Sequence, residues 1–213
     1  MLNERSPRRG FMLAVSSPSG AGKTSLCRRL TADHDHLVLS ISVTTRAPRP
    51  GEEHAREYHF ITDAEFDRLI EQDALLEWAE VHGARYGSPR FPIEQALEAG
   101  EDVLFDIDWQ GAATIAQKAP KDTVRIFVLP PSIGELRRRL YARAQDVPEV
   151  IERRIRNARK EIERSTAADY VIVNDDFDRS YAELAHIYHA ERSRAHRNLW
   201  LPDHVASLLE EPV

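Results

Sequence analysis

The chain has 213 residues, with 29 Lys and Arg against 35 Asp and Glu, so its formal net charge is -6 at pH 7. This length suits one domain with a sizeable core and room for insertions, and the acidic balance argues against non-specific nucleic-acid binding. Because Cys27 is the only cysteine, no disulfide can form within the chain, which fits a reducing, cytoplasmic setting.

The first residues precede the expected body of the protein. Residues 1–9 have no apolar stretch behind their arginines, so we expect a disordered lead-in and not a signal peptide. No run in the chain approaches the roughly 18 apolar residues of a membrane-spanning helix, so no membrane partner is expected. Residues 11–15 are apolar and predict the first strand.

A loop of small residues follows this strand and leads into an expected helix, on which Leu26 and Leu30 lie one turn apart. Strand, small-residue loop and helix are the context of a phosphate-binding loop, whose backbone N–H groups face phosphate oxygens. Lys23 can reach the β- and γ-phosphates, and the Thr24 hydroxyl can bind Mg²⁺. An ordinary turn before a helix is the alternative, because Ser17 stands where the general motif has glycine. The expected ATP-phosphate residues are Ser17, Pro18, Ser19, Gly20, Ala21, Gly22, Lys23 and Thr24.

A loop with two arginines follows the second expected strand, which residues 37–43 form because they are rich in β-branched side chains. Arg46 and Arg49 in this loop suit either an anion clamp or a solvated surface. Short strands and one helix are then expected, so residues 42–91 are interpreted as a small mixed insertion.

The second half alternates strands and helices. Residues 103–108 predict a strand with Asp106 and Asp108 on one face near its carboxyl end, where ligands gather in an open α/β sheet. Further strands at 123–129 and 168–174 indicate a parallel sheet with helices on both faces. Two arginine-rich helical segments separated by a break at 144–148 indicate a movable lid, and a solvated helical surface is the alternative.

The sequence resembles guanylate kinases from about residue 10 to residue 192. The resemblance rests on five motifs in the family's order: Ser-Pro-Ser-Gly-Ala-Gly-Lys-Thr (17–24), Thr-Thr-Arg-Ala-Pro-Arg (44–49), Tyr-Gly-Ser (86–88), Asp-Ile-Asp-Trp-Gln-Gly (106–111) and Val-Asn-Asp-Asp (173–176). It implies an α/β fold with a P-loop NTPase-type parallel sheet flanked by helices. The implied parts are a core at 10–41 and 92–192, a GMP-binding insertion at 42–91, a helical lid at about 137–160 and a tail at 193–213.

The resemblance also implies a reaction and its residues. ATP would phosphorylate GMP to ADP and GDP with Mg²⁺, in purine nucleotide metabolism. Thr24 and Asp106 would hold the metal, although capping of the next helix is an alternative for Asp106. Asn174 would lie near the adenine. The implied catalytic residues are Lys23, Arg46, Arg143 and Arg154, and the implied GMP residues are Ser42, Arg46, Arg49, Tyr58, Glu77, Tyr86, Gly87, Ser88 and Asp108.

The carboxylates suit guanine on chemical grounds. Ionised Glu77 and Asp108 only accept hydrogen bonds, and guanine offers the N1–H and N2–H₂ donors along one edge. Adenine presents a lone pair at N1 and would leave a carboxylate unpaired. The acceptor phosphate is already anionic, so no general base is needed, and the nine histidines are interpreted as surface residues.

Two other functions fit parts of the pattern. A non-catalytic interaction module with this fold would have lost the phosphate-handling residues that this chain keeps, and a kinase for another acceptor, such as a ribose phosphate, would not need the guanine-reading set. Ala142 and Ala144 flank Arg143 where relatives commonly have glycine, which predicts a stiffer hinge. The tail is expected to dock on the body or on a partner subunit, and a homodimer is the assembly considered.

Overall fold

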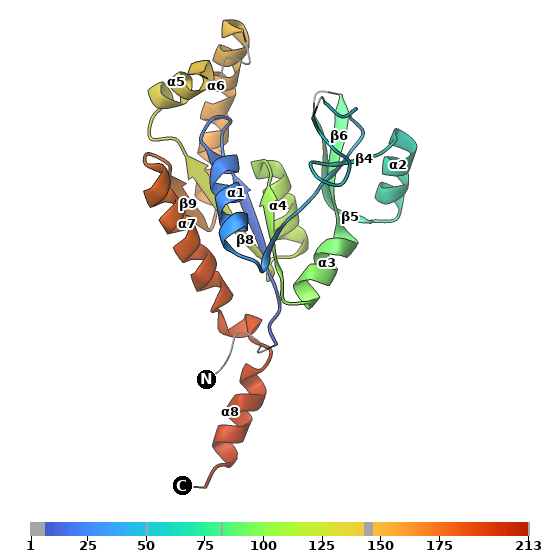
Figure 1. Ribbon diagram of the computed structural model, residues 1–213, viewed down its shortest axis with the longest axis vertical. Coiled ribbons are helices and arrows are strands. Elements are labelled where there is room, and N and C mark those ends of the chain that lie inside the picture. The colour runs from blue at the N-terminus through green and yellow to red at the C-terminus, as the bar shows by residue number, and fades with distance from the viewer. Residues whose placement is uncertain (1–6, 50, 82, 143–146, 213) are drawn as a thin grey trace.

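The computed structural model describes residues 7–49, 51–81, 83–142 and 147–212 (Figure 1). Its larger sheet has five parallel strands in the order β2-β7-β1-β8-β9. The expected parallel sheet is therefore present, with the strand that precedes the phosphate-binding loop at its centre. The strands are β1 (Met12–Ser16), β2 (Leu37–Leu39), β7 (Asp102–Asp106), β8 (Thr123–Leu129) and β9 (Tyr170–Val173).

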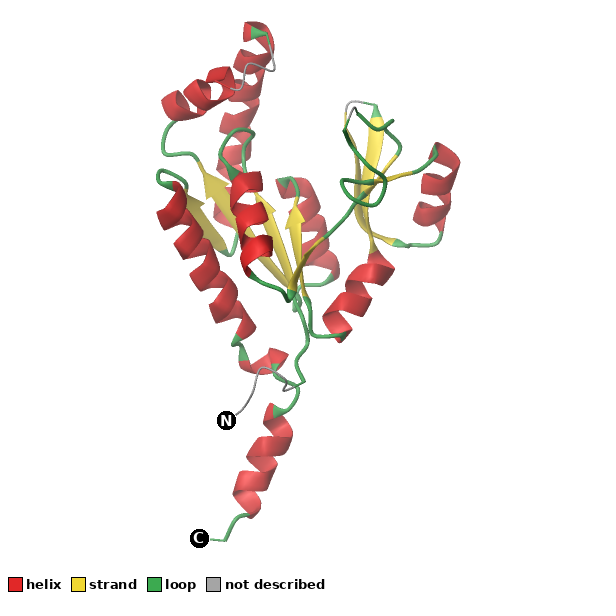
Figure 2. Ribbon diagram, in the orientation of Figure 1, coloured by secondary structure: helices red, strands yellow, loops and turns green. Residues whose placement is uncertain are grey.

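Helices cover both faces of this sheet (Figure 2). Alternate side chains of a strand point to opposite faces, so Leu13 and Val15 pack on one side and Met12 and Ala14 on the other. The first side is covered by α1 (Lys23–Asp33) and α7 (Phe177–Arg192), and the second by α3 (Arg90–Glu98) and α4 (Trp109–Lys118). Burial on both faces explains why β1 is apolar throughout.

A separate mixed sheet forms the insertion, in the order β4-β3-β6-β5. It is built from β3 (Val43–Thr44), β4 (His59–Phe60), β5 (Leu75–Val81), β6 (Ala84–Pro89) and the helix α2 (Asp63–Glu71). The expected single strand over residues 37–43 is wrong. β2 ends at Leu39, Ser40 N–H still donates to the Leu104 carbonyl, and Val43 begins a strand of the other sheet. The chain crosses from the core to the insertion within this apolar run.

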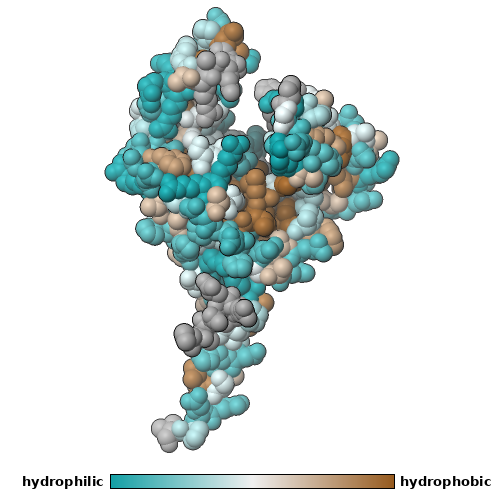
Figure 3. All heavy atoms as spheres, viewed as in Figure 1, coloured by the Kyte–Doolittle hydropathy of each residue, from teal (hydrophilic) through white to brown (hydrophobic). Residues whose placement is uncertain are grey.

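Two arms rise from the core, one on each side of a hollow (Figure 3). One arm is the insertion, and the other consists of α5 (Ile133–Ala142) and α6 (Pro148–Ile162), which continues into a short 3-10 helix, η1 (Glu163–Ala167). The two helices pack through Leu136, Leu140, Ile151 and Ile155. The phosphate-binding loop lies at the base of this second arm, because Leu136 and Leu140 surround Gly20.

The first and last segments of the folded body meet at the opposite end of the sheet. Arg8 pairs with the fully buried Asp102, and Arg9 pairs with Asp122, so these two residues belong to the folded body, although the sequence predicted them to be part of the lead-in. A short 3-10 helix, η2 (Ala195–Arg197), packs nearby through Arg197. The last helix, α8 (Leu201–Glu210), points away from the body and has no buried residue, so it does not dock there (Figure 1). Among the described residues, no helix is both long and apolar enough to cross a membrane.

Candidate active site

The loop between β1 and α1 has the backbone that an anion site needs. Gly20 and Gly22 have φ angles of 95° and 99°, a region that favours glycine. Among the described residues the only non-glycine residues with positive φ are Ala55 and Asp73, so the position of Ser17 does not require glycine. Gly22 is the N-cap residue of α1, and no side chain caps this end of the helix. The first N–H groups of the helix are therefore available to an anion.

A cavity of about 360 Å³ opens in front of this loop. Lys23 forms an ion pair with Asp106, which ends β7 beside β1. Thr24 and Asp106 line the same cavity. The cavity is lined by Ser17, Ser19, Gly20, Gly22, Lys23, Thr24, Ser25, Asp106, Ile107, Asp108, Trp109 and Glu161.

One lysine and three acidic residues line this cavity, and burial shifts the pKa of two of these groups. Burial lowers the pKa of Lys23 to about 8, while the nearby Cys27 and Asp108 oppose this shift, and the contact with Asp106 also favours the charged form. Burial also raises the pKa of Glu161, which lies in α6 and faces the loop across the cavity. A bound triphosphate would restore the preference of Lys23 for its charged form.

Asn174 supports the loop from behind. Its side chain is only 4% exposed, and its Nδ2 donates to the Ala21 carbonyl at 2.7 Å. Arg139 of α5 donates to the same carbonyl at 3.2 Å and to the Asn174 carbonyl at 3.0 Å. The Asn174 amide thus holds the phosphate-binding loop, and its expected position near the adenine stays a prediction. Pro18 and Ala21 are likewise buried in the loop and not part of the cavity lining.

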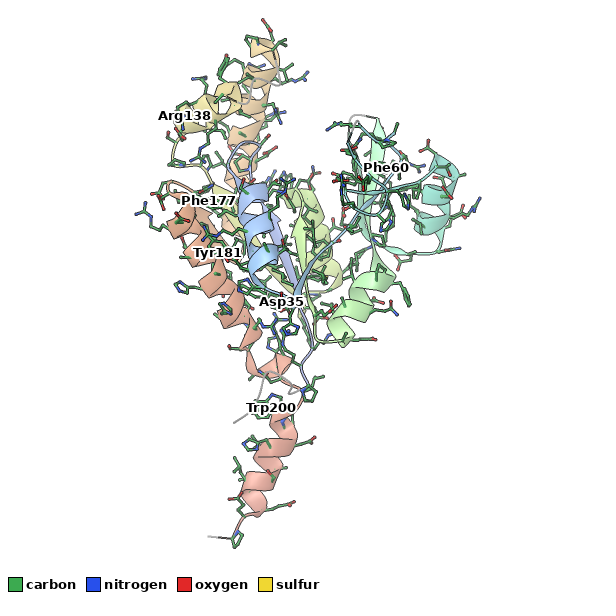
Figure 4. All side chains as sticks on the ribbon, in the orientation of Figure 1. Asp35, Phe60, Arg138, Phe177, Tyr181 and Trp200 are labelled. Carbon is green, nitrogen blue, oxygen red and sulfur yellow. The ribbon has the colours of Figure 1, made fainter. Side chains whose placement is uncertain are left out.

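The arm formed by α5 and α6 contacts the loop through one expected residue. Arg154 of α6 donates from Nη2 to the Ser19 hydroxyl at 2.8 Å. Other lid arginines form surface ion pairs, such as Arg137 with Glu152 and Arg138 with Glu135, and Arg138 lies on the outer side of the arm (Figure 4). The expected catalytic Arg143 lies outside the described residues, as does Ala144.

Two carboxylates converge where the insertion meets the core. Glu77 of β5 is 8% exposed and accepts from the Ser88 hydroxyl at 2.6 Å, across the register of β5 and β6. A Cβ on Gly111 would lie 3.3 Å from Glu77 Oε2 and 3.5 Å from Asp108 Oδ1. Burial raises the pKa of Glu77, the Ser88 hydrogen bond opposes this shift, and the charge of Asp108 adds to it. Asp108 also caps α4, because it accepts from Gly111 N–H at 2.8 Å.

A second cationic site lies within the insertion. Arg46 donates from Nε to the Tyr86 hydroxyl at 3.2 Å, and its guanidinium carbon lies 5.3 Å from the Tyr58 ring centre and 5.7 Å from that of Phe60. Phe60 is labelled in Figure 4. The rings of Tyr58 and Tyr86 meet edge to face at 5.8 Å. Arginine framed by tyrosines suits a phosphate group, which takes hydrogen bonds from both.

Comparison with known proteins decides the family. Residues 10–191 match the family model described as guanylate kinase. The chain is 54% identical to a guanylate kinase of Caulobacter vibrioides over 213 residues, which is 100% of both chains. A guanylate kinase of Mesorhizobium japonicum is 54% identical over 210 residues, which is 99% of this chain and 96% of that protein. The chain belongs to the guanylate kinase family.

A solved guanylate kinase has the same architecture. The crystal structure of guanylate kinase from Anaplasma phagocytophilum matches this chain with a TM-score of 0.78 and 35% sequence identity, over 98% of this chain and 100% of that one. The expected fold class is thereby confirmed: a parallel sheet flanked by helices, with a separate small mixed sheet.

The expected GMP residues of this guanylate kinase gather in the insertion and at its border with the core. Gly87 and Ser88 are buried in β6, and a Cβ on Gly87 would meet Leu75 at 3.0 Å and Trp78 at 3.2 Å. Ser42 and Tyr58 are half-buried, whereas Arg49 is exposed. The expected phosphate residues and the expected base residues therefore lie in or beside one small sheet, except Asp108, which precedes α4 in the core.

Sequence reasoning missed three residues of this guanylate kinase. Arg139 was not distinguished from its neighbours, because a run of arginines does not show which one faces inward. Glu161 lines the cavity from a helix whose pattern indicated only a charged surface. Glu52 pairs with Arg46 at 2.8 Å, and the Pro-Gly turn between them is the signal that could have indicated it.

Proposed function

We propose how this chain catalyses the guanylate kinase reaction, the reversible transfer of a phosphoryl group from ATP to GMP that gives ADP and GDP. The loop before α1 holds the ATP phosphates, and the insertion holds GMP. One observation carries the second assignment: the carboxylates of Glu77, in β5, and Asp108, at the start of α4, converge beside Gly111. Two acceptors at one place suit a base that presents adjacent N–H donors.

Base selection follows from this pair. Glu77 and Asp108 accept from the N1–H and N2–H₂ groups of guanine, and Ser42 and Ser88 supply hydroxyls near the base. The Ser88 hydrogen bond holds the Glu77 carboxylate in place before GMP arrives. Adenine would place a lone pair against a buried carboxylate, which costs roughly 1–3 kcal/mol.

Phosphate handling is divided between the two arms. Arg46, Arg49, Tyr58 and Tyr86 bind the GMP phosphate, while Lys23 and the backbone of the loop bind the ATP phosphates. Arg154, and Arg143 outside the described residues, approach the transferring group from the lid. Phosphoryl transfer needs charge neutralisation and alignment more than a general base, so cations from both sides of the hollow suit the reaction. Closure of the arms would exclude water.

Mg²⁺ fits the donors that line the cavity. A kinase holds Mg²⁺ through one or two protein oxygens together with substrate phosphates, and here Thr24 and Asp106 lie in one cavity with the loop. Among the described residues there is no cluster of three or more His, Cys, Asp or Glu that could hold a metal alone. The ion would neutralise charge on the ATP phosphates, and Thr24 and Asp106 would orient it.

A coupled ADP-release assay with different phosphate acceptors tests the proposed catalysis. We expect turnover with GMP and ATP, and far less with AMP, CMP or a ribose phosphate. Lys23→Ala should abolish turnover, whereas Lys121→Ala, which removes an exposed lysine elsewhere, should not. Absence of GMP turnover would refute the assignment, and preference for a ribose phosphate would favour a different acceptor.

The tail supports a homodimer in the cytoplasm. Val205, Leu208 and Leu209 are 46–82% exposed on α8, which has no buried residue, and Leu199 just before this helix is 55% exposed. A second copy of the chain would bury this face, and the free, buried Cys27 suits a reducing compartment. Truncation after Leu199 should convert a dimer into a monomer in sedimentation equilibrium, while removal of residues 212–213 should not. A monomeric full-length chain would contradict the proposal.

A further inference from the structure

Glu52 closes the arginine loop that follows β3. Its Oε2 accepts from the Arg49 backbone N–H at 2.7 Å, and its own N–H donates to the Arg49 carbonyl at 3.0 Å. The same carboxylate accepts from Arg46 Nη1 at 2.8 Å and from Nη2 at 3.0 Å, which is a bidentate pair. The side chains of Arg46 and Glu52 are 17% and 18% exposed, so water does not readily replace this pair.

The hydrogen bonds of Arg46 leave one N–H of its guanidinium for a ligand. Nη1 donates to Glu52 and to the Ala47 carbonyl, Nη2 donates once to Glu52, and Nε donates to the Tyr86 hydroxyl. Within the described residues, these contacts use four of the five N–H groups of the guanidinium. The remaining N–H of Nη2 lies on the Nε side, next to the Tyr86 hydroxyl.

We propose that Glu52 is a positioning residue for the GMP phosphate. By holding the Nη1–Nη2 edge of Arg46, it presents the remaining Nη2 N–H and the adjacent Tyr86 hydroxyl to the phosphate oxygens. The inference rests on the proposed role of Arg46 in binding that phosphate. Without Glu52, the guanidinium could rotate and turn this N–H away from the Tyr86 hydroxyl, and the loop that carries Arg49 would lose its closing contact.

Charge alone predicts the opposite effect. Glu52 is an anion near the phosphate, and at about 7 Å in water its repulsion would weaken GMP binding about threefold for each charge on the phosphate. Loss of an orienting hydrogen bond to a charged group weakens binding more, by about tenfold or above. Positioning therefore outweighs repulsion. The hydrogen bond with Arg46 holds the pKa of Glu52 at about 2, so the carboxylate stays ionised at working pH.

The test is Glu52→Gln, with Glu53→Gln as the matched control, because Glu53 is 68% exposed and pairs only with Arg56 among the described arginines. We expect KM for GMP to rise about tenfold or more in E52Q, with KM for ATP within twofold. Guanosine lacks the phosphate, so its inhibition constant against GMP should change less than twofold. The control should match the wild type.

Two kinetic outcomes would contradict the positioning role of Glu52. An unchanged or lower KM for GMP would overturn the proposal, and so would an equal loss of guanosine binding, because the effect would then not be specific to the phosphate. Wild-type protein that does not turn over GMP would instead defeat the proposed function. Arg46→Lys gives a second readout: lysine has no planar edge to orient, so adding E52Q to this variant should raise KM by less than threefold.

Discussion

Replacement of Glu77 by Gln tests whether the charge of this carboxylate selects the base, as we propose. Glutamine has nearly the shape of glutamate, and its side-chain oxygen can still accept from the Ser88 hydroxyl, which donates at 2.6 Å. Its amide nitrogen would then take the place of Oε2, which lies on the side of Asp108. A donor would face the N–H donors of guanine, and one charge-assisted hydrogen bond would be lost.

The size of the effect follows from that exchange. Loss of a hydrogen bond to a charged group, with a donor left facing a donor, costs about 2–3 kcal/mol, or roughly 30- to 160-fold in kcat/KM for GMP. KM for ATP should stay within twofold, because the ATP phosphates lie at the other arm. The preference for GMP over AMP should fall, since adenine N1 can accept from the new amide.

Steady-state kinetics with GMP, AMP and ATP measure this, and Glu80→Gln is the control because Glu80 is exposed on the same strand. Burial raises the pKa of Glu77, so the neutral variant avoids a desolvation cost and its melting temperature should equal or exceed that of the wild type. A change in kcat/KM for GMP below threefold, or an equal change for ATP, would refute the role of Glu77 in reading guanine.

Two further predictions concern the phosphate-binding loop. The pKa of Lys23 is about 8, so its charge is present below that pH and lost above it; kcat/KM for ATP should fall as pH rises from 7.5 to 9.5, while kcat at saturating ATP falls only at higher pH. A flat kcat/KM profile across this range would contradict it. Gly22→Ala should lower the melting temperature and raise KM for ATP, since φ is 99° and the new Cβ would overlap Asn174. Gly83→Ala, with φ 77° and open space around it, carries backbone strain alone and should cost less, about 1 kcal/mol, by chemical denaturation.

Local pattern identified the elements whose signals lie within one segment. The strands β5 at 75–81 and β8 at 123–129 have the predicted bounds, because apolar runs there end at turns or prolines. The run at 37–43 has the same local signal and is divided between two sheets. Which partner strand each half pairs with is a tertiary choice that the segment itself does not encode.

The candidate site shows the same division. The loop at 17–24 could be anticipated, because its motif lies within one segment. The hydrogen bond between Glu77 and Ser88 could not, because it depends on the register of β5 and β6. The position of Asn174 could not, since an amide after a strand suits a ligand and a loop carbonyl equally well. Glu52 was hidden for a similar reason: charged residues in a loop normally indicate solvent contact, and only the folded turn brings this one onto Arg46.

The strand β7 is fastened at both of its ends by carboxylates. At its first residue, Asp102 is enclosed by Arg8, Tyr188, Arg192 and the Phe11 N–H. Asp106, the last residue of β7, pairs with Lys23, and Asp108, two residues further along the chain, lies near Glu77. A strand of this length spans about 17 Å. Two consecutive peptide units after this anchored strand therefore set the distance between Asp106, proposed for the metal, and Asp108, proposed for the base. Removal of Arg8 would loosen the opposite end of the strand.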